Sequence, residues 1–261
     1  MTQPGMTQPG VTTERLDGTV LVIAIDRPAV RNAVDAATAR QLADAFDELD
    51  ADAGLRVGIL TGKGGDFCTG MDLAAATRGE RPIVPGRGFG GLTERPPRTP
   101  LIAAVEGYAL AGGFEMVLAC DLIVASRTAW FGLPEVRRGL IAGAGGLLRL
   151  PERIPYQAAV RLALTGDRMD AATAERHGLL TELVDEGDAL AAATTLARRI
   201  AANAPLAVRN SKRILAELGR PVPAERYAAQ EPLLREVYDS ADAQEGVLAF
   251  TEKRPPRWQG R

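Results

Sequence analysis

The sequence predicts an α/β protein that ends in a helical module, and three observations support this. Segments rich in β-branched residues alternate with amphipathic segments through the first two thirds of the chain, as in a sheet that helices cover on both faces. No segment after Pro205 has the composition of a strand. The 261 residues are 46% hydrophobic and 25% charged, so the chain can bury a core of ordinary size.

The N-terminal elements follow from local patterns. Residues 19–26 (TVLVIAID) form a β-branched run and predict a strand. Asp35 is placed to cap a helix in which Leu42, Phe46 and Leu49 fall on one face. Further strands are predicted at 56–61, 101–105 and 122–125, and a helix is predicted at 113–120.

The stretch 75–100 differs from its surroundings. It contains five arginines, two glutamates and many glycines and prolines, which predicts a long loop. Loops of this length inside compact domains are either mobile segments or functional covers. We expect a mobile segment, with a lid over an anionic ligand as the alternative.

After Pro151 the chain is helical in pattern. Helices are predicted at 156–165, 171–177, 189–203, 205–218, 224–238 and 241–253. The first ten residues repeat MTQPG and predict a disordered tail. We therefore divide the chain into a tail (1–12), an α/β core (13–204) and a C-terminal helical module (205–261).

Composition excludes several classes of function. Lys and Arg number 31 against 33 Asp and Glu, a net charge of −2, so no positive field attracts nucleic acid or an anionic membrane. No apolar run is long enough to span a bilayer. One histidine and two cysteines form no metal-ligand cluster and no disulfide framework. We expect a cytoplasmic protein without a metal.

A glycine pair precedes the helix predicted at 113–120. The start of a helix leaves backbone N–H groups free and carries partial positive charge, so Gly112 can present its N–H to a developing oxyanion. Its missing side chain would leave room for a substrate. Glu115 lies in the first turn, where a carboxylate is favoured whether or not it reacts. Taken alone, close packing and a helix-start charge explain this segment as well.

Residues 67–73 (FCTGMDL) repeat this pattern, with a glycine before a predicted helix start. The N–H of Met71 is a candidate for a second oxyanion donor, with its side chain pointing away. The alternative is that Met71 and Leu73 are only core residues.

Glu135 follows Pro134 at a predicted strand-to-helix turn. Two glutamates in one pocket suffice to add water to a double bond or to remove it. One deprotonates the water, the other handles the carbon-bound proton, and their proximity separates their pKa values. The spacing of Glu115 and Glu135 in the sequence does not show that they meet.

These three segments, in this order, resemble the crotonase superfamily of acyl-coenzyme A enzymes, and the resemblance covers residues 13–261. Supporting matches are RPAVRNA at 27–33, AGAGGLLRLP at 142–151, LTG at 164–166 and LAFTEKR at 248–254. The resemblance implies a spiral core of ββα units and a C-terminal helical module that builds trimers, often paired into hexamers.

The resemblance also implies residue roles. It places a thioester carbonyl between the backbone N–H groups of Met71 and Gly112, and it makes Glu115 and Glu135 the two hydratase carboxylates. Coenzyme A is expected to contact Val30, Arg31, Ala33, Asp72, Leu73, Phe250 and Lys253, the last two from the C-terminal helix of a neighbouring subunit. Ala74 stands where many members carry a basic residue.

Both glutamates are present, which favours an enoyl-CoA hydratase. Such an enzyme adds water reversibly and syn to a trans-2-enoyl-CoA to give a 3-hydroxyacyl-CoA. It needs no cofactor, because coenzyme A is part of the substrate. The alternatives are a Δ3,Δ2-enoyl-CoA isomerase, an enzyme like the carnitinyl-CoA dehydratases or the hydratases of steroid side chains, and a non-catalytic acyl-CoA-binding protein. The sequence leaves open the acyl chain, the physiological direction and the individual glutamate roles.

Overall fold

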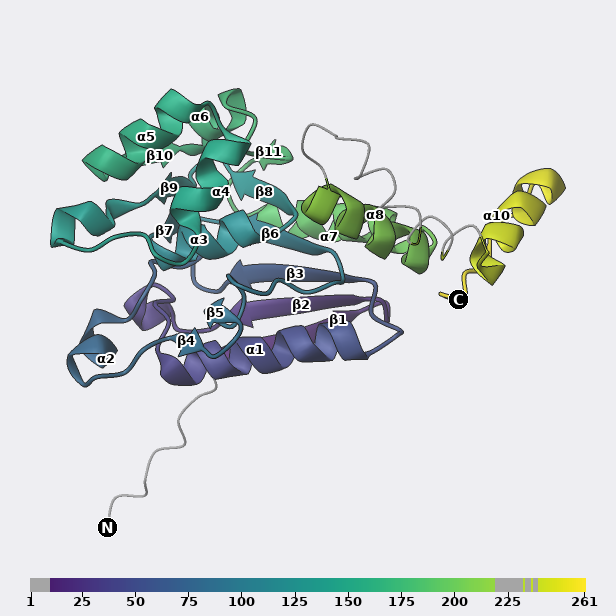
Figure 1. The fold of residues 1–261 in the computed structure, drawn as a ribbon, viewed down its shortest axis with the longest axis horizontal. Coiled ribbons are helices and arrows are strands. Elements are labelled where there is room, and N and C mark those ends of the chain that lie inside the picture. Colours follow the sequence, from purple (N-terminus) through teal and green to yellow (C-terminus); the bar gives the residue numbers. More distant parts are fainter. Residues whose placement is uncertain (1–9, 219–231, 233–235, 237–238) are drawn as a thin grey trace, which may run out of the picture.

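A six-stranded sheet forms the centre of the protein, which is represented by a computed structural model that describes residues 10–218, 232, 236 and 239–261 (Figure 1). Its strand order is β1-β2-β3-β6-β8-β11, and every neighbouring pair is parallel except β1 with β2. The strands are β1 (Val11–Leu16), β2 (Val20–Ile25), β3 (Val57–Gly62), β6 (Leu101–Val105), β8 (Leu122–Ser126) and β11 (Glu182–Val184).

A smaller sheet runs in the order β10-β9-β7, and a hairpin pairs β4 with β5. Twice, a strand of the large sheet is followed by a strand of the small sheet and then by a helix, as β6-β7-α3 and β8-β9-η2. This is the ββα unit that the resemblance implied. The strands are β4 (Ile83–Val84), β5 (Gly88–Phe89), β7 (Tyr108–Leu110), β9 (Trp130–Gly132) and β10 (Arg168–Asp170).

Helices cover both faces of the large sheet, so its central strands are buried on both sides, whereas the edge strands β1 and β11 are partly exposed. One face packs on α7, where alanines four residues apart let the helix approach closely. The other face packs on the remaining core helices. The helices are η1 (Pro28–Val30), α1 (Ala36–Ala51), α2 (Leu73–Thr77), α3 (Gly112–Ala119), η2 (Pro134–Arg138), α4 (Gly146–Arg153), α5 (Tyr156–Thr165), α6 (Ala171–Arg176), α7 (Ala189–Ala201), α8 (Pro205–Leu218) and α10 (Ala241–Glu252).

The structure confirms the four strands predicted in the N-terminal half and the helix that Asp35 caps, whose carboxylate accepts from the N–H of Thr38 at 2.8 Å. The predicted disordered tail (1–12) differs from the structure at its end. Residues 11 and 12 belong to β1, where they pair with Ile25 and Ala24. Antiparallel pairing to an already buried strand orders a segment whose own sequence is mostly polar.

The expectation of a mobile loop over 75–100 is wrong for its central part. The β4–β5 hairpin lies here, and Phe89 and Leu92 are 5% and 0% exposed. The buried Arg87 guanidinium donates to the carbonyl of Gly91 at 3.0 Å and pairs with Asp47 on α1. The many glycines make this stretch look like a loop, although they permit a tight turn that packs closely on α1.

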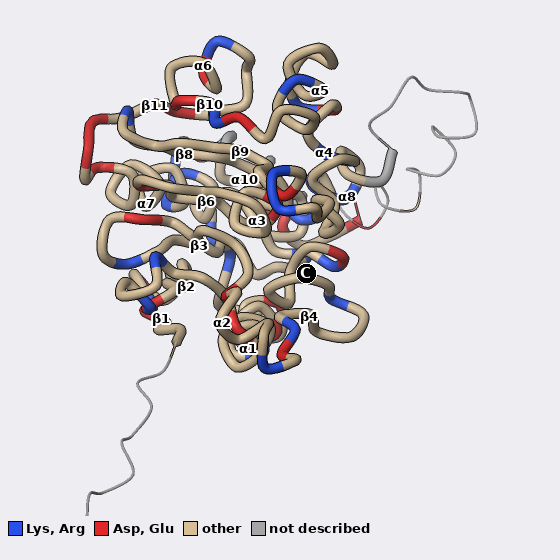
Figure 2. Tube along the Cα trace, turned by 90° about the vertical axis from the view of Figure 1, so that its left-hand side faces the viewer, with Lys and Arg blue, Asp and Glu red and all other residues tan. Residues whose placement is uncertain are grey.

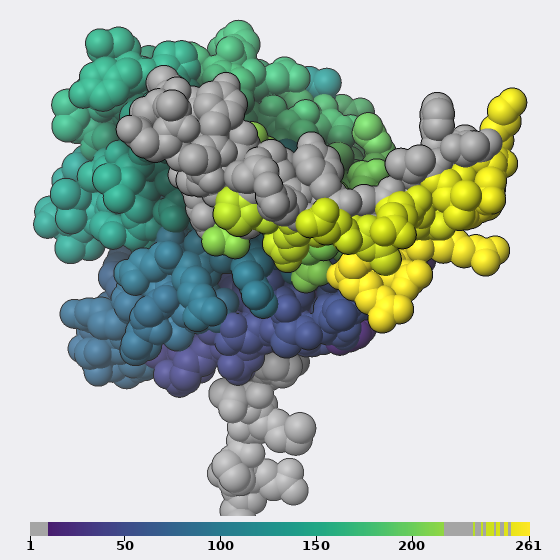
Figure 3. Space-filling model, turned by 45° about the vertical axis from the view of Figure 1, so that its right-hand side comes forward, coloured from purple at the N-terminus to yellow at the C-terminus, as the bar shows by residue number. Residues whose placement is uncertain are grey.

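The C-terminal helices extend from the core. Lys212 on α8 donates to Asp121 at 2.7 Å and to two carbonyls of the 97–99 segment, which ties α8 to the sheet. In Figure 3, α10 and the chain end project beyond the rest of the surface. The predicted helices at 205–218 and 241–253 are present, whereas the one at 224–238 lies mostly outside the described residues. The boundary at 204 stays a prediction.

Charged residues of both signs are interspersed along the chain (Figure 2). In the described part of the chain, no helix has the length and apolar character required to cross a membrane.

Candidate active site

Two glycine turns that are distant in the sequence meet at the start of α3. Residues 67–70 run beside β7, because the N–H of Cys68 donates to Tyr108 and its carbonyl accepts from Leu110. Gly70 has a φ of +97°, and a methyl group there would lie 3.1 Å from the backbone nitrogen of Gly112. The peptide that follows Gly70 is therefore held next to the first turn of α3.

The amides of Met71 and Gly112 are both free donors. Val34 binds the carbonyl of Gly70 and the N–H of Asp72, so the N–H of Met71 between them points to the opposite side. Gly112 is the first residue of α3, where backbone N–H groups have no partner within the helix. Within the described residues, neither amide donates a hydrogen bond. The Met71 side chain packs against the core, whereas Leu73, which the alternative interpretation also placed in the core, is exposed.

The glycine pair of α3 is also required by packing. A Cβ on Gly112 would lie 2.5 Å from the Phe89 ring, and one on Gly113 would lie 2.2 Å from the carbonyl oxygen of Cys68. The space that we expected to admit a substrate beside Gly112 is therefore filled by an aromatic side chain. Sequence reasoning missed Phe89 because it lies in the stretch interpreted as a loop.

Glu115 is held rigidly on α3. Its side chain is 3% exposed, and its Oε1 atom accepts from the N–H groups of Ala144 at 2.8 Å and Gly146 at 2.9 Å. Burial raises the pKa of this carboxyl, while the two amides and the Arg149 guanidinium act in the opposite direction. The glycine-rich turn before α4, known from the sequence only as a family match, thus forms the clamp for Glu115.

Glu135 has a different environment, on the short helix η2 that Pro134 begins. Burial raises the pKa of its carboxyl to about 7, and the nearby charge of Glu115 contributes in the same direction. Its Oε2 atom is buried and has no hydrogen-bond partner among the described residues. The structure therefore brings together two interacting carboxyls with unequal surroundings.

The residues expected to contact coenzyme A fall into two groups. Val30, Arg31 and Leu73 are exposed next to the Val34–Met71 bridge. Ala33 is buried and its carbonyl accepts from Arg27, while Asp72 caps α2 and pairs with Arg27 at 3.0 Å. These last two have structural roles of their own.

Phe250 and Lys253 form the second group and lie elsewhere. Phe250 belongs to α10, with its side chain outside the described part, and Lys253 is an exposed residue that follows the helix. In Figure 1, α10 lies at the opposite end of the molecule from α2. A single chain therefore does not bring the two groups together.

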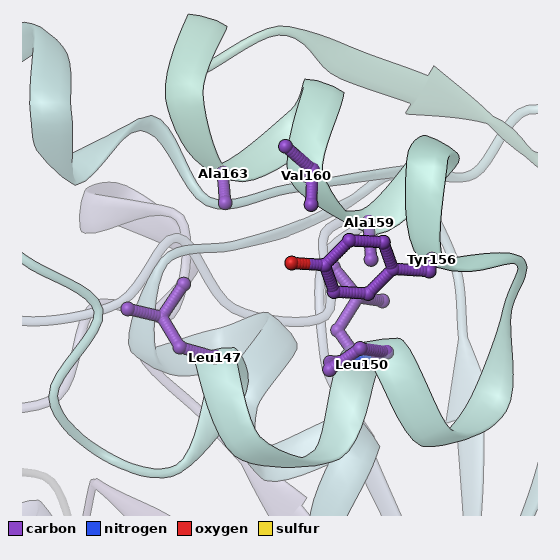
Figure 4. A pocket seen from close by; sticks show the side chains of 7 residues that line it. Leu147, Leu150, Tyr156, Ala159, Val160 and Ala163 are labelled. Carbon is purple, nitrogen blue, oxygen red and sulfur yellow. The ribbon is translucent and has the colours of Figure 1, made fainter.

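An apolar pocket of about 160 Å³ lies between α4 and α5 (Figure 4). It begins at Leu147, directly after the Gly146 that binds Glu115, but neither glutamate lines it. Its lining consists of Leu147, Leu150, Pro151, Tyr156, Ala159, Val160 and Ala163.

Among the described residues, no group of His, Cys, Asp and Glu side chains has an arrangement that holds a metal.

Comparisons with known proteins agree on one family. Residues 15–261 match the family model described as enoyl-CoA hydratase/isomerase. The chain is 58% identical to an enoyl-CoA hydratase from Mycobacterium marinum, with a TM-score of 0.94 over 97% of this chain and all of that one. An enoyl-CoA hydratase from Mycobacterium tuberculosis H37Rv is 57% identical, with a TM-score of 0.95 over the same shares. A carnitinyl-CoA dehydratase from Proteus mirabilis is 42% identical over 94% of this chain and 96% of that protein.

Proposed function

The chain belongs to the enoyl-CoA hydratase/isomerase family, and from this premise we propose that it is a hydro-lyase that adds water reversibly to a trans-2-enoyl-CoA. The product is a 3-hydroxyacyl-CoA. The observation that carries this proposal is the placement of two free amide donors at the start of the same helix that bears Glu115, with Glu135 interacting with that carboxylate.

The amides of Met71 and Gly112 bind the thioester oxygen in this proposal. When water attacks C3, the π electrons move toward that oxygen and form an enolate. Two preorganised donors in a site shielded from water stabilise this developing charge strongly, because they need no reorganisation during the reaction. Gly112 adds the partial positive charge at the start of α3.

The two glutamates move the protons. Glu115, clamped by two amides, orients the attacking water and takes its proton. Glu135, with a pKa near 7, delivers a proton to C2 and collapses the enolate. The C3–O and C2–H bonds form on the same face, and dehydration reverses each step.

A carnitinyl-CoA dehydratase is the second candidate, and the 42% identical relative of that name favours it. Its chemistry is the same elimination on a substituted acyl chain, so the two candidates differ only in the acyl group.

The coenzyme A contacts and the trimer or hexamer expected from the resemblance belong to this proposal, as does the cytoplasmic location. Light scattering of the purified protein measures the assembly.

The decisive experiment compares wild type, Glu115→Gln and Glu135→Gln on crotonyl-CoA, longer enoyl-CoAs and crotonobetainyl-CoA in ¹⁸O-labelled water. Hydration introduces the label at C3, whereas isomerisation introduces none. We expect each variant to lose about 10²–10⁴-fold in kcat. Wild-type rates in both variants would refute the mechanism. Tight acyl-CoA binding without turnover on any substrate would instead show a non-catalytic binding protein.

A further inference from the structure

Arg149 lies on α4, one turn after the glycine that binds Glu115. Its side chain is partly buried, and burial lowers the pKa of the guanidinium, yet an arginine stays charged in proteins. Its Nη2 atom donates to the backbone carbonyl of Thr93 at 2.6 Å. A partly buried cation thus connects α4 to the hairpin segment 88–93.

Thr93 in turn fixes Phe89. The Oγ1 atom of Thr93 accepts from the N–H of Phe89 at 2.9 Å, and the N–H of Thr93 donates to the carbonyl of Phe89 at 3.3 Å. The Phe89 ring fills the space beside Gly112. A continuous series of contacts therefore leads from Arg149 to the helix start that presents the Gly112 amide.

The same guanidinium acts on the Glu115 carboxylate. Glu115 is faced by the Ala144 and Gly146 amides and the Arg149 cation, all from α4 and the turn before it, and it interacts with Glu135 on η2. The pKa of Arg149 is itself affected by Arg153 and the buried Cys120. Among the charged side chains that act on Glu115, Arg149 is the one that favours the anionic form of its carboxyl.

We propose that Arg149 is a positioning residue for hydration, in which one guanidinium fixes the turn that carries Phe89 against Gly112 and supplies the positive charge that faces Glu115. Neither the carbonyl of Thr93 nor the carboxylate of Glu115 has to move for this, because Arg149 already binds the first and Gly146, one turn earlier on α4, binds the second. The inference rests on the proposed function, since it assigns a task within that reaction.

The test compares Arg149→Gln and Arg149→Lys with Arg153→Gln as the matched control. Arg153 lies on the same helix, is also partly buried and donates to the carbonyl of Cys120 at 2.7 Å, but is not among the charges that act on Glu115. We expect Arg149→Gln to lose about 10–100-fold in kcat/KM for hydration and to move the acidic limb of the pH profile upward. Arg149→Lys should keep the acidic limb of the pH profile at its wild-type position but should not keep the full rate, because a lysine lacks the planar guanidinium with its several donors in fixed directions. Arg153→Gln should leave the limb in place.

A second readout does not require turnover. The Glu115 carboxyl is titrated by ¹³C NMR in glutamate-labelled protein, with Glu115→Gln identifying its signal, and it should titrate at higher pH in Arg149→Gln only. An unchanged titration in Arg149→Gln, or an equal shift in Arg153→Gln, overturns the proposal. If Arg149→Gln does not fold, a wild-type rate in Arg149→Lys overturns the positioning role. A wild-type protein that hydrates no enoyl-CoA refutes the proposed function instead, and the titration still decides the role of Arg149.

Discussion

Glu115 and Glu135 carry the same functional group in two contrasting regions of the molecule. Glu115 lies on a fully buried helix, and one of its oxygens accepts two backbone hydrogen bonds. Glu135 lies on a short 3-10 helix in which no residue is fully buried, and one of its oxygens has no partner among the described residues. Burial raises the cost of ionisation in both regions, and in the first region two amides and a nearby cation offset part of that cost.

This difference separates the proton-transfer tasks. Burial raises the pKa of both carboxyls, but two backbone donors and a cation oppose the shift at Glu115, whereas the charge of Glu115 adds to the shift at Glu135. Each carboxyl also affects the other, so the two titrate as a pair. Hydration needs one base and one acid at the same pH, and this pair of regions supplies both.

Among the changes compared below, the largest loss of activity is expected when the Glu115 carboxylate is displaced from the two amides that bind it. A methyl group on Gly146 would lie 3.0 Å from the Oε1 atom of Glu115, so Gly146→Ala pushes the carboxylate from its two amides. We expect kcat/KM for hydration to fall about 10²–10³-fold while the fold is retained, as steady-state kinetics and circular dichroism will show.

Gly143→Ala is the matched control for this substitution. Gly143 lies in the same turn and is exposed, and the nearest atom to its added methyl group is 3.8 Å away. Its activity should stay within about twofold of wild type. An equal loss in both variants would mean that the turn, and not the clamp, limits the reaction.

The pH dependence should reflect the two carboxyls as a pair. Hydration starts from ionised Glu115 and protonated Glu135, whose pKa is about 7, so kcat/KM should fall about tenfold per pH unit above that value. Dehydration starts from the same singly protonated pair with the proton on Glu115, and the reaction releases no net proton, so its kcat/KM should fall over the same pH range. Rates measured in both directions between pH 5 and about 9 test this. A dehydration profile that rises with pH above about 7 would contradict the assignment of one shared proton to the pair.

The sequence predicted the framework because its signals are local. Runs such as 19–26 and 101–105 are long enough for β-branched composition to identify them, and Asp35 marks a helix start on its own. The strands β7, β9, β10 and β11 have three residues each, too few for periodicity to show. Their position depends on pairing with distant segments.

The candidate site was predicted in part. The glycine turns and both glutamates followed from motifs in the chain. The roles of Phe89 and Arg149 were not predicted from the sequence. Phe89 lies in a segment rich in glycine, proline and arginine, which is typical of a loop. Arg149 acts on Thr93, which is 56 positions away. Such contacts arise from packing between elements, and single-sequence patterns carry no record of them.

A smaller effect should appear in stability. The pKa of Glu135 is raised from 4.5 to about 7 in the folded protein, so wild type loses stability as pH rises through this window, because the folded state resists ionisation. Glu135→Gln removes this penalty and should gain about 1–3 kcal/mol over wild type above the window, and nothing below it. Thermal or urea unfolding at several pH values measures the difference. A gain that is independent of pH would show that packing, not ionisation, is responsible.

The smallest effect is expected away from both carboxyls. Arg31 is an exposed cation 3.8 Å from Asp66 and stacks on Tyr108, outside the proton-transfer region. If it contacts a phosphate of coenzyme A, Arg31→Gln should raise KM about two- to fivefold, more at low ionic strength than at high, with kcat unchanged. The pH profile should keep both limbs, because this substitution alters neither carboxyl environment. Steady-state kinetics at two salt concentrations tests this, and a change in kcat would place Arg31 within the catalytic region.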